Sequence, residues 1–575
     1  MAEIKHTLDD INNVFKIPIC YNTKVQKLNA NIVADLELIK TVEPDENSIY
    51  DNVFRPSDKC SNKVLEQFAT NYTTDTKYLK QTQKLIKKTK STQLNTIQNK
   101  HQVNIDNVVS LWEEIKNETG FKEKYLYIDW EFAKGLNNNA HFLQIMSIYN
   151  IASPILSLCL PIFVLIIPFF VIKMKGVVLT INEYIDILKV LIAGNSLVKI
   201  FTQFHEVDNG QKIYLLVSAA FYLFSIYQNI LVCIRFYSNM QKIHNYIYNF
   251  KQYIAYTLDI MDYHSSVSSK LTKYKEFNIC LEYHKLTLSK MYAQLNITPF
   301  SFSFTKLTQI GHIMHIFYQL YDNEEYNNAL IYSFGFNGYF NILLETSINV
   351  QTNKLAKTLY TNKPSKPVFK KMFYPKYINN DSIKNDCNLK KNMIITGPNA
   401  SGKTTTLKTA LINIILSQQI GYGCFESLKF CPYDNIHCYL NIPDTSGRDS
   451  LFQAEARRCK EILDIIHLEK SKTHFCVFDE LYSGTNPEEA VVSAFAFMDY
   501  LIKNNNVTCI LTTHYVNLCK KLENHDNIKN YSMRTIQTDD NFEYTYCLKE
   551  GISQIKGGIK VLKDMDYPQE ILINL

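Results

Sequence analysis

A short apolar segment, a glycine-rich loop and a helical pattern follow one another near the end of this chain. Met393–Thr396 has the composition of a strand, and it leads directly into GPNASGKT at residues 397–404. Residues 405–419, TTLKTALINIILSQQ, then have the pattern of a helix. Strand, G-x-x-x-x-G-K-[ST] and helix in this order are the context of a phosphate-binding loop, whose backbone N–H groups surround nucleotide phosphates. The sequence therefore predicts an α/β P-loop NTPase domain at the C-terminal end.

The residues of this loop have distinct expected roles at a bound ATP. Lys403 is expected to reach the β- and γ-phosphates and to assist catalysis, while the Thr404 hydroxyl is expected to ligate Mg²⁺. The residues expected to contact nucleotide here are Gly397, Pro398, Asn399, Ala400, Ser401, Gly402, Lys403, Thr404 and Thr405.

A second apolar strand, His474–Phe478, ends in two carboxylates, Asp479 and Glu480. A carboxylate at this edge of a sheet can hold Mg²⁺, which we assign to Asp479. The adjoining Glu480 is placed to act as the general base on the attacking water. An acidic helix cap is the alternative, but the strand before the pair and Ser483-Gly484-Thr485 after it disfavour that interpretation.

A third strand, Val507–Leu511, is followed by Thr512, Thr513 and His514. His514 lies where ABC-type ATPases place a switch histidine, so we expect it to contact the γ-phosphate during catalysis. At the end of the helix after the loop, Gln419 is a candidate water and metal contact, with an ordinary polar helix end as the alternative.

Two uncharged stretches of 22 residues interrupt the first half of the chain, Ile151–Ile172 and Ile213–Ile234. A helix of that length spans about 30 Å of hydrocarbon. Pro154, Pro161 and Pro168 would each cost a soluble helix about 3 kcal/mol, whereas membrane helices tolerate them. We therefore predict a transmembrane hairpin; burial of both stretches in a soluble helical core is the alternative. The ATPase requires nucleotide, so its domain is expected on the cytosolic or nuclear side of the membrane.

The remaining composition indicates a folded, intracellular protein of several domains. At 575 residues the chain exceeds one core, and it begins without an apolar secretory signal. Its scattered cysteines, including Cys424, Cys431 and Cys438, are expected to be reduced and buried rather than to bind metal. The net charge of +6 permits a nucleic acid or acidic membrane partner without requiring one.

The rest of the N-terminal part has a helical character. Residues 57–119 and 211–298 contain neither proline nor glycine, which predicts an all-α helical stalk on either side of the hairpin. Lysines at 77, 80, 84, 87 and 88 recur at helical spacing; a solvated face is the ordinary interpretation, and phosphate contact is the alternative. The expected domains are an N-terminal segment (1–56), a first stalk arm (57–150), the hairpin (151–234), a second arm (235–365) and the ATPase domain (366–575).

Five motifs in order make the C-terminal part resemble the MutS family of DNA mismatch-repair ATPases. The resemblance covers about residues 365–570. It depends on TGPNASGKTT (396–405), SQQIGYGCF (417–425), SLFQAE (450–455), FDELYSGTNPEE (478–489) and TTHY (512–515), with GISQIKGGIKVLKDMDYP (551–568) as a further similar segment.

This resemblance implies further roles. Ser450 would complete the γ-phosphate site of a partner subunit in a homodimer, and Phe373 would stack on the adenine. The chain departs from the family at Leu451, where the pattern has threonine, and at the acidic Asp449. It has too little sequence for a mismatch-reading domain and a connector, and so resembles the membrane-associated MutS-related proteins.

These observations lead to one main functional hypothesis and two alternatives. The main hypothesis is a membrane-anchored, dimeric ATPase of the MutS type that hydrolyses ATP with Mg²⁺, with binding of mismatched or branched DNA coupled to ATP. The first alternative is a soluble DNA mismatch-repair or recombination ATPase with the apolar stretches buried. A half-size ABC transporter is less favoured, because such proteins usually carry about six spans and an LSGGQ-type signature.

Overall fold

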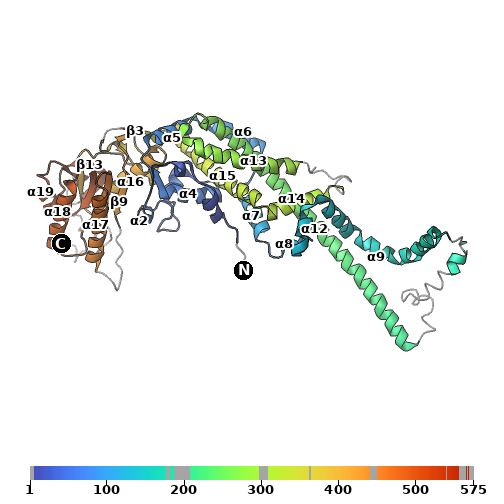
Figure 1. Ribbon diagram of the computed structural model, residues 1–575. Coiled ribbons are helices and arrows are strands. Elements are labelled where there is room, and N and C mark those ends of the chain that lie inside the picture. The colour runs from blue at the N-terminus through green and yellow to red at the C-terminus, as the bar shows by residue number, and fades with distance from the viewer. Residues whose placement is uncertain are drawn as a thin grey trace. The chain divides into compact units, whose positions relative to one another are not determined.

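A computed structural model of the chain divides into two compact units (Figure 1). The first unit contains residues 1–6, 107–255 and 287–328, and the second contains 7–106, 256–286 and 329–575. Each unit therefore combines segments that are distant in sequence, unlike the contiguous domains that composition predicted, because helices pack side by side with partners far along the chain. The described residues are 5–176, 180, 182–186, 208–296, 308–361, 364–440, 450–538, 541–555, 565 and 567–568.

The described part of the first unit is helical and has an aromatic core. The ring of Phe121 stacks on Tyr321 with centroids 3.8 Å apart, and Tyr246 stacks on Phe317 at 5.7 Å. Gly311 permits close helix contact, since a Cβ there would lie 2.2 Å from the carbonyl oxygen of Ala140. The elements that lie in or enter this unit are α7 (Ile105–Asn117), α8 (Phe121–Lys124), η3 (Glu131–Asn138), α9 (Ala140–Met174), α12 (Asn209–Ser268), α13 (Lys275–Asn296), α14 (Ile310–Asp322) and α15 (Glu324–Gln351).

Both predicted membrane-spanning stretches are helical, in α9 and α12. Two stretches are long and apolar enough to cross a membrane by length and composition, Ala140–Cys159 and Lys212–Ser268, and only 22% and 11% of their most apolar windows are buried. Most of the described side chains in these windows are thus not enclosed in a helical core. Most of the connection between the helices lies outside the described residues, so the hairpin stays a prediction.

The N-terminal part of the second unit is not all-α as predicted. β1 (Val25–Lys27) pairs antiparallel with β2 (Asn71–Thr73). The stretch 57–119 is broken into four helices and this strand, because Asp58 and Asp75 cap new helices with their carboxylates. The further elements are η1 (Leu8–Asp10), α1 (Ile11–Val14), η2 (Pro18–Tyr21), α2 (Ala30–Asp35), α3 (Ile49–Phe54), α4 (Lys59–Thr70), α5 (Thr76–Lys88), α6 (Ser91–Lys100) and η4 (Thr272–Tyr274).

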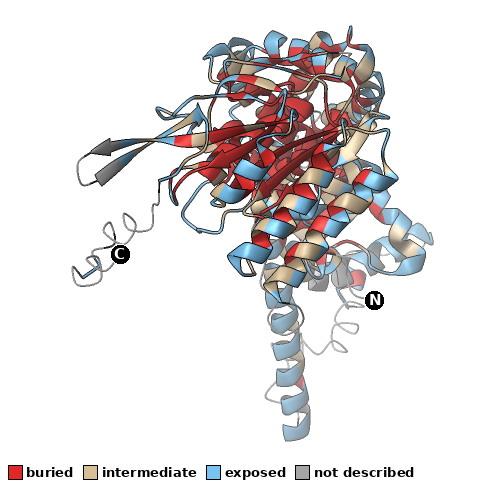
Figure 2. Cartoon of the chain, turned by 90° about the vertical axis from the view of Figure 1, so that its left-hand side faces the viewer, coloured by how far each residue is buried: buried red, intermediate tan, exposed pale blue. Residues whose placement is uncertain are grey.

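A six-stranded sheet forms the centre of the predicted P-loop domain, in the order β13-β12-β6-β11-β10-β9. Five strands are parallel and β13 is antiparallel at the edge. Figure 2 shows the inner strands of this sheet buried beneath helices with exposed outer faces, while none of the described side chains of the edge strand β13 is buried. The elements are β6 (Asn392–Thr396), β9 (Asn435–Tyr439), β10 (His474–Asp479), β11 (Val507–Thr513), β12 (Ile528–Thr538), β13 (Asn541–Glu550), α16 (Lys403–Gln419), α17 (Leu451–Leu468), α18 (Pro487–Ile502) and α19 (Val516–Leu522).

A second sheet has the order β5-β4-β8-β3-β7. It begins at residue 356, ten residues before the predicted boundary at 366, because β3 pairs with β7 and β8 of the same sheet. Its elements are β3 (Ala356–Tyr360), β4 (Val368–Met372), η6 (Pro375–Tyr377), β5 (Asn385–Asn388), β7 (Tyr422–Gly423) and β8 (Ser427–Phe430).

Candidate active site

The predicted strand, loop and helix are confirmed as β6, residues 397–402 and α16. All five residues of β6 are buried, so the loop starts from a fixed position. Two loop residues have left-handed backbone, Ala400 with φ of 60° and Gly402 with φ of 93°. A side chain at Gly402 would be strained at that φ, and its Cβ would lie 3.1 Å from the ring of Tyr546.

Lys403 is buried and folded back on this loop. Its Nζ donates to the carbonyl oxygens of Gly397 at 3.1 Å and Pro398 at 3.2 Å. Burial lowers the pKa of Lys403, while the nearby carboxylates of Glu480 and Asp479 oppose the change. An ammonium in this position supplies positive charge where nucleotide phosphates would lie.

Parallel pairing brings the other two motifs to the same edge of the sheet. β11 lies between β6 and β10, and register places Thr513 beside Thr396 and Asp479 beside Thr512. Ligands of open α/β sheets bind at the carboxyl ends of their strands. The three motifs therefore meet at one place although they are up to 118 residues apart in sequence.

Asp479 and Thr404 are in direct contact, as expected of two ligands to one magnesium ion. The Thr404 hydroxyl donates to Asp479 Oδ2 at 2.9 Å, and the Thr512 hydroxyl donates to Oδ1. Mg²⁺ prefers a few hard oxygen ligands together with phosphate and water. A hydroxyl next to a carboxylate fits this preference.

Glu480 and His514 form an ion pair or hydrogen bond across the site. His514 Nε2 lies 2.8 Å from Glu480 Oε1 and 3.1 Å from Lys403 Nζ. Because a ring nitrogen either donates or accepts, Nε2 can donate to Glu480 or accept from Lys403 but cannot do both. The hydrogen bond from His514 lowers the pKa of Glu480 against the effect of burial, which keeps this carboxylate ionised and able to accept a proton.

The backbone of Glu480 is itself unusual, with φ of 52°. A non-glycine residue in this region costs about 1–2 kcal/mol, and such strain concentrates at functional sites. The backbone N–H of Glu480 donates to the carbonyl oxygen of Thr512 at 3.0 Å, which holds the carboxylate at the edge of the sheet.

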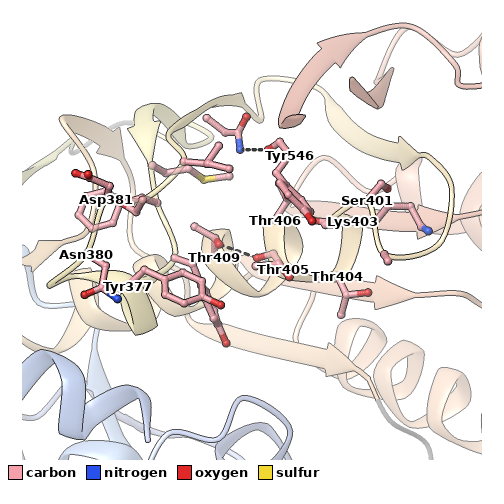
Figure 3. A pocket seen from close by; sticks show the side chains of 18 of the residues that line it. Tyr377, Asn380, Asp381, Ser401, Lys403, Thr404, Thr405, Thr406, Thr409 and Tyr546 are labelled. Carbon is pink, nitrogen blue, oxygen red and sulfur yellow. Dashed lines mark hydrogen bonds between the residues drawn. The ribbon is translucent and has the colours of Figure 1, made fainter. Parts of the chain in front are cut away.

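A cavity of about 710 Å³ adjoins the phosphate loop. This volume is within the roughly 300–1,000 Å³ of small-molecule sites. Figure 3 shows Lys403 and Thr404 at one end, with Tyr377, Asn380 and Asp381 towards the other. Phe373, predicted to contact adenine, lines the cavity, as do Asn399 through Thr405.

Tyr546 is a lining residue that the sequence analysis missed. It comes from β13, and Asn385 holds its backbone: Asn385 Nδ2 donates to the Tyr546 carbonyl at 2.9 Å, and Asn385 Oδ1 accepts from Leu548 N at 2.7 Å. The ring lies over the loop at Gly402 and borders the cavity (Figure 3). No motif surrounds Tyr546, so only the pairing of β13 with β12 reveals its position.

Gln419 is not brought to this cavity, in contrast to the expectation of a water and metal contact. It lies at the opposite end of α16 from Lys403, about 24 Å along a helix of this length. Its buried amide donates to the carbonyl oxygens of Phe68 and Asn71 and accepts from the Tyr50 hydroxyl at 2.7 Å. The side chain of Gln419 therefore holds the end of α16 to the N-terminal part of the chain through hydrogen bonds.

Ser450 is exposed and does not line the cavity of its own chain. It caps α17 with a capping box, in which its hydroxyl accepts from Gln453 N at 3.3 Å. Asp449 lies outside the described residues.

The family model and the relatives found by comparison with known proteins all carry the name MutS or MutS2. Residues 393–574 match the model of MutS domain V. The chain is 28% identical over 201 residues to the DNA mismatch repair protein MutS of Orientia tsutsugamushi (strain Ikeda), a match that covers 33% of this chain and 21% of that protein. It is 31% identical over 186 residues to the Endonuclease MutS2 of Fusobacterium nucleatum, which covers 31% of this chain and 22% of the relative. The chain thus spans about a fifth of the length of the curated relatives it matches.

Proposed function

Because residues 393–574 make this chain a member of the MutS family, we propose that the protein binds ATP with Mg²⁺ and hydrolyses it. The observation that carries this proposal is the convergence of five side chains at one sheet edge. Lys403 Nζ, the Thr404–Asp479 pair and the Glu480–His514 pair all lie beside the phosphate loop.

The chain's own residues divide the work of hydrolysis. The phosphate loop and Lys403 bind the phosphates. To do so, Lys403 gives up its hydrogen bonds to the Gly397 and Pro398 carbonyls and contacts phosphate oxygens instead. Mg²⁺, held by Thr404 and Asp479, would neutralise phosphate charge when bound. Glu480 accepts the proton of the attacking water. His514 orients Glu480 and, by turning towards Lys403, senses the γ-phosphate.

The protein acts as a homodimer in this proposal. Ser450 is exposed at the N-terminal end of α17 and lies apart from its own cavity, which supports a role at the nucleotide of a second copy. A helix N-terminus carries positive partial charge that suits a phosphate.

DNA is the proposed partner, in mismatch repair or a related process on mismatched or branched DNA. The relatives are named for DNA mismatch repair and as an endonuclease, and none of the quoted names concerns a membrane. The comparisons therefore support the DNA-repair role more directly than they support membrane anchoring.

Membrane anchoring through α9 and α12 is the second candidate, because their apolar side chains are exposed. Leu223 is 65% exposed and Phe224 is 57% exposed. Contact of such large apolar side chains with water is unfavourable. The two helices also contact each other: the Tyr222 hydroxyl donates to the Ser157 carbonyl at 2.8 Å, and Asn229 Nδ2 donates to Ser157 Oγ at 2.5 Å. Polar contacts between apolar helices are typical of membrane pairs. In this arrangement the ATPase domain faces the cytosol or nucleoplasm.

A Glu480→Gln variant tests the proposed hydrolysis. The turnover number for ATP should fall at least 100-fold, since general-base catalysis contributes roughly 10²–10⁴-fold, while the Kd for ATP stays within threefold. Glu488→Gln, at an exposed position at the start of α18, is the matched control. Undiminished turnover in Glu480→Gln would reject Glu480 as the base.

A further inference from the structure

The stretch from Thr76 to Ile105 concentrates positive charge. It contains seven lysines and no aspartate or glutamate, although the formal net charge of the whole chain is only +6. Charge of one sign is therefore gathered on α5 and α6 and is not spread over the molecule.

In α5 this charge lies on one face. Tyr78, Leu79, Leu85 and Ile86 are buried on the other side of the helix. The exposed residues include five lysines, which we call the α5 lysine face: Lys77, Lys80, Lys84, Lys87 and Lys88.

The α5 lysine face has no acidic partner within the part of the chain that the structure describes, because the neighbouring carboxylates are already paired. Asp75, which caps α5, lies 2.6 Å from Lys273. α12 contacts the end of α5 through the Tyr263 hydroxyl, which donates to the carbonyl oxygen of Lys88 at 3.5 Å. On α12, Asp259 pairs with Lys100 at 2.7 Å and Asp262 with Lys285 at 2.5 Å.

The lysines of this face repel one another weakly, and a bound polyanion would relieve that repulsion. Like charges three or four residues apart on a helix repel each other by about 0.2–0.5 kcal/mol per pair, and the lysines follow one another at these steps. From Lys77 to Lys88 the face extends about 17 Å along the helix axis. Duplex nucleic acid carries about one negative charge per 1.7 Å of its axis, so the face can meet several phosphates at once.

The occupant that fits this face is a phosphate backbone rather than a lipid surface. A helix that binds in a membrane interface inserts exposed apolar side chains next to its basic ones. The large apolar side chains of α5 are instead buried in the protein, which leaves lysines and polar groups outside.

The α5 lysine face is also firmly connected to the phosphate loop. At the end of α16, Gln418 Nε2 donates to the carbonyl oxygen of Thr73 at 3.3 Å, and Gln419 Nε2 donates to that of Asn71 at 3.2 Å. Both carbonyls belong to β2, directly before α5, and α16 begins at Lys403. One helix therefore joins the lysine-bearing element to the nucleotide site.

We propose that the α5 lysine face binds the phosphate backbone of duplex nucleic acid, and that this contact changes ATP turnover through α16. Only the second half rests on the proposed ATPase activity. Binding itself requires no hydrolysis, so the two can fail separately.

The test uses the purified full-length protein and a 30-base-pair duplex of arbitrary sequence, with binding measured between 50 and 200 mM salt. The triple variant Lys80→Glu/Lys84→Glu/Lys87→Glu should bind at least 30-fold more weakly. The slope of log K against log salt should fall by about 2.7, at roughly 0.9 for each lost phosphate contact. Lys390→Glu/Lys391→Glu/Lys470→Glu makes the same charge change at exposed positions of the same unit and should stay within threefold of wild type.

Three outcomes would overturn the binding half: equal losses in both triple variants, an unchanged salt slope, or binding to phosphatidylserine vesicles without binding to the duplex. If charge reversal prevents folding, Lys80→Gln/Lys84→Gln/Lys87→Gln replaces it, with the same expected change in slope.

The coupling half is tested by ATP turnover with and without the duplex. Duplex should change the turnover of wild type at least twofold, and that change should be absent in the Lys80→Glu/Lys84→Glu/Lys87→Glu variant, whose turnover without duplex should match wild type. Duplex binding by wild type with no effect on turnover would overturn the coupling. Absence of all turnover would reject the proposed function and leave the binding result intact.

Discussion

The carboxylate of Glu455 accepts hydrogen bonds from both the backbone N–H of Ser483, at 3.1 Å, and its hydroxyl, at 2.9 Å. The other oxygen accepts from Gly484 N at 3.2 Å, and Glu455 is only 2% exposed. Glu455 lies on α17, five residues after Ser450, while Ser483 follows Glu480, the proposed base, by three residues. The helix that presents Ser450 is thus tied to the loop that positions Glu480.

We predict that Glu455→Ala lowers ATP turnover at least tenfold and changes the Kd for ATP by less than threefold. The N–H groups of Ser483 and Gly484 would lose a charged acceptor, and hydrogen bonds to charged groups contribute about 1.5–3 kcal/mol each. Glu480 would then lose its anchored position. Steady-state kinetics and nucleotide titration check this. Glu461→Ala, at an exposed position of the same helix, is the control; equal effects of both changes would argue against the anchoring role.

Tyr546→Ala should weaken ATP binding about three- to tenfold, because an aromatic contact with a ring system contributes about 0.5–1.5 kcal/mol. Inorganic tripolyphosphate lacks the base, so its affinity should be unchanged, and Tyr546→Phe should bind ATP like wild type. Calorimetric titration with both ligands provides the measurement. A parallel loss of tripolyphosphate affinity would mean that Tyr546 acts on the phosphate loop at Gly402 instead of on the adenine ring.

Acid should destabilise the fold through His437. Burial lowers the pKa of His437 to about 3, and the adjacent His474, whose Nδ1 lies 3.1 Å from His437 Nε2, adds to this effect. An unfolded histidine titrates near 6.5, so below that pH the unfolded chain binds more protons than the folded one. The contribution of neutral His437 to the free energy of unfolding is therefore complete above pH 6.5, and it is lost at about 1.4 kcal/mol per pH unit as the pH falls towards 3.

His437→Gln should reduce this dependence by about that amount per pH unit, since glutamine can hydrogen-bond with His474 without titrating. Urea unfolding at pH 7, 6 and 5 measures the slope. His525→Gln, at a partly exposed histidine that pairs with Asp499, should leave the slope nearly as in wild type. An unaltered slope in His437→Gln would assign the acid sensitivity to other groups.

If α12 spans a membrane, Leu223→Arg should reduce membrane retention. An arginine near the centre of a span costs about 2.5–3.5 kcal/mol in insertion, and Leu223 lies near the middle of Ile213–Ile234. Fractionation followed by carbonate extraction measures the retained share. Tyr237→Arg, beyond the apolar stretch and 58% exposed, should be retained like wild type; recovery of the wild-type protein in the supernatant without detergent would favour the soluble alternative.

The sequence by itself predicted the phosphate loop, Asp479, Glu480 and His514 as candidate site residues, and the similarity of residues 393–574 to MutS domain V. This was sufficient because strand, loop and helix are contiguous, so their chemistry depends on local backbone geometry and on short motifs at strand ends. The parallel order β6-β11-β10 then brings these ends together.

Only the tertiary structure decided which partners surround those motifs. Gln419 is in a family motif, yet its amide is taken by Phe68, Asn71 and Tyr50, more than 340 residues earlier in the chain. Tyr546 has no motif and reaches the cavity because β13 pairs with β12. The α5 lysine face has the sequence pattern of a solvated helix face, and only the tertiary contacts show that Asp259 and Asp262 pair with other lysines. Each of these depends on contacts between segments far apart in sequence, which helical spacing and local motifs do not encode.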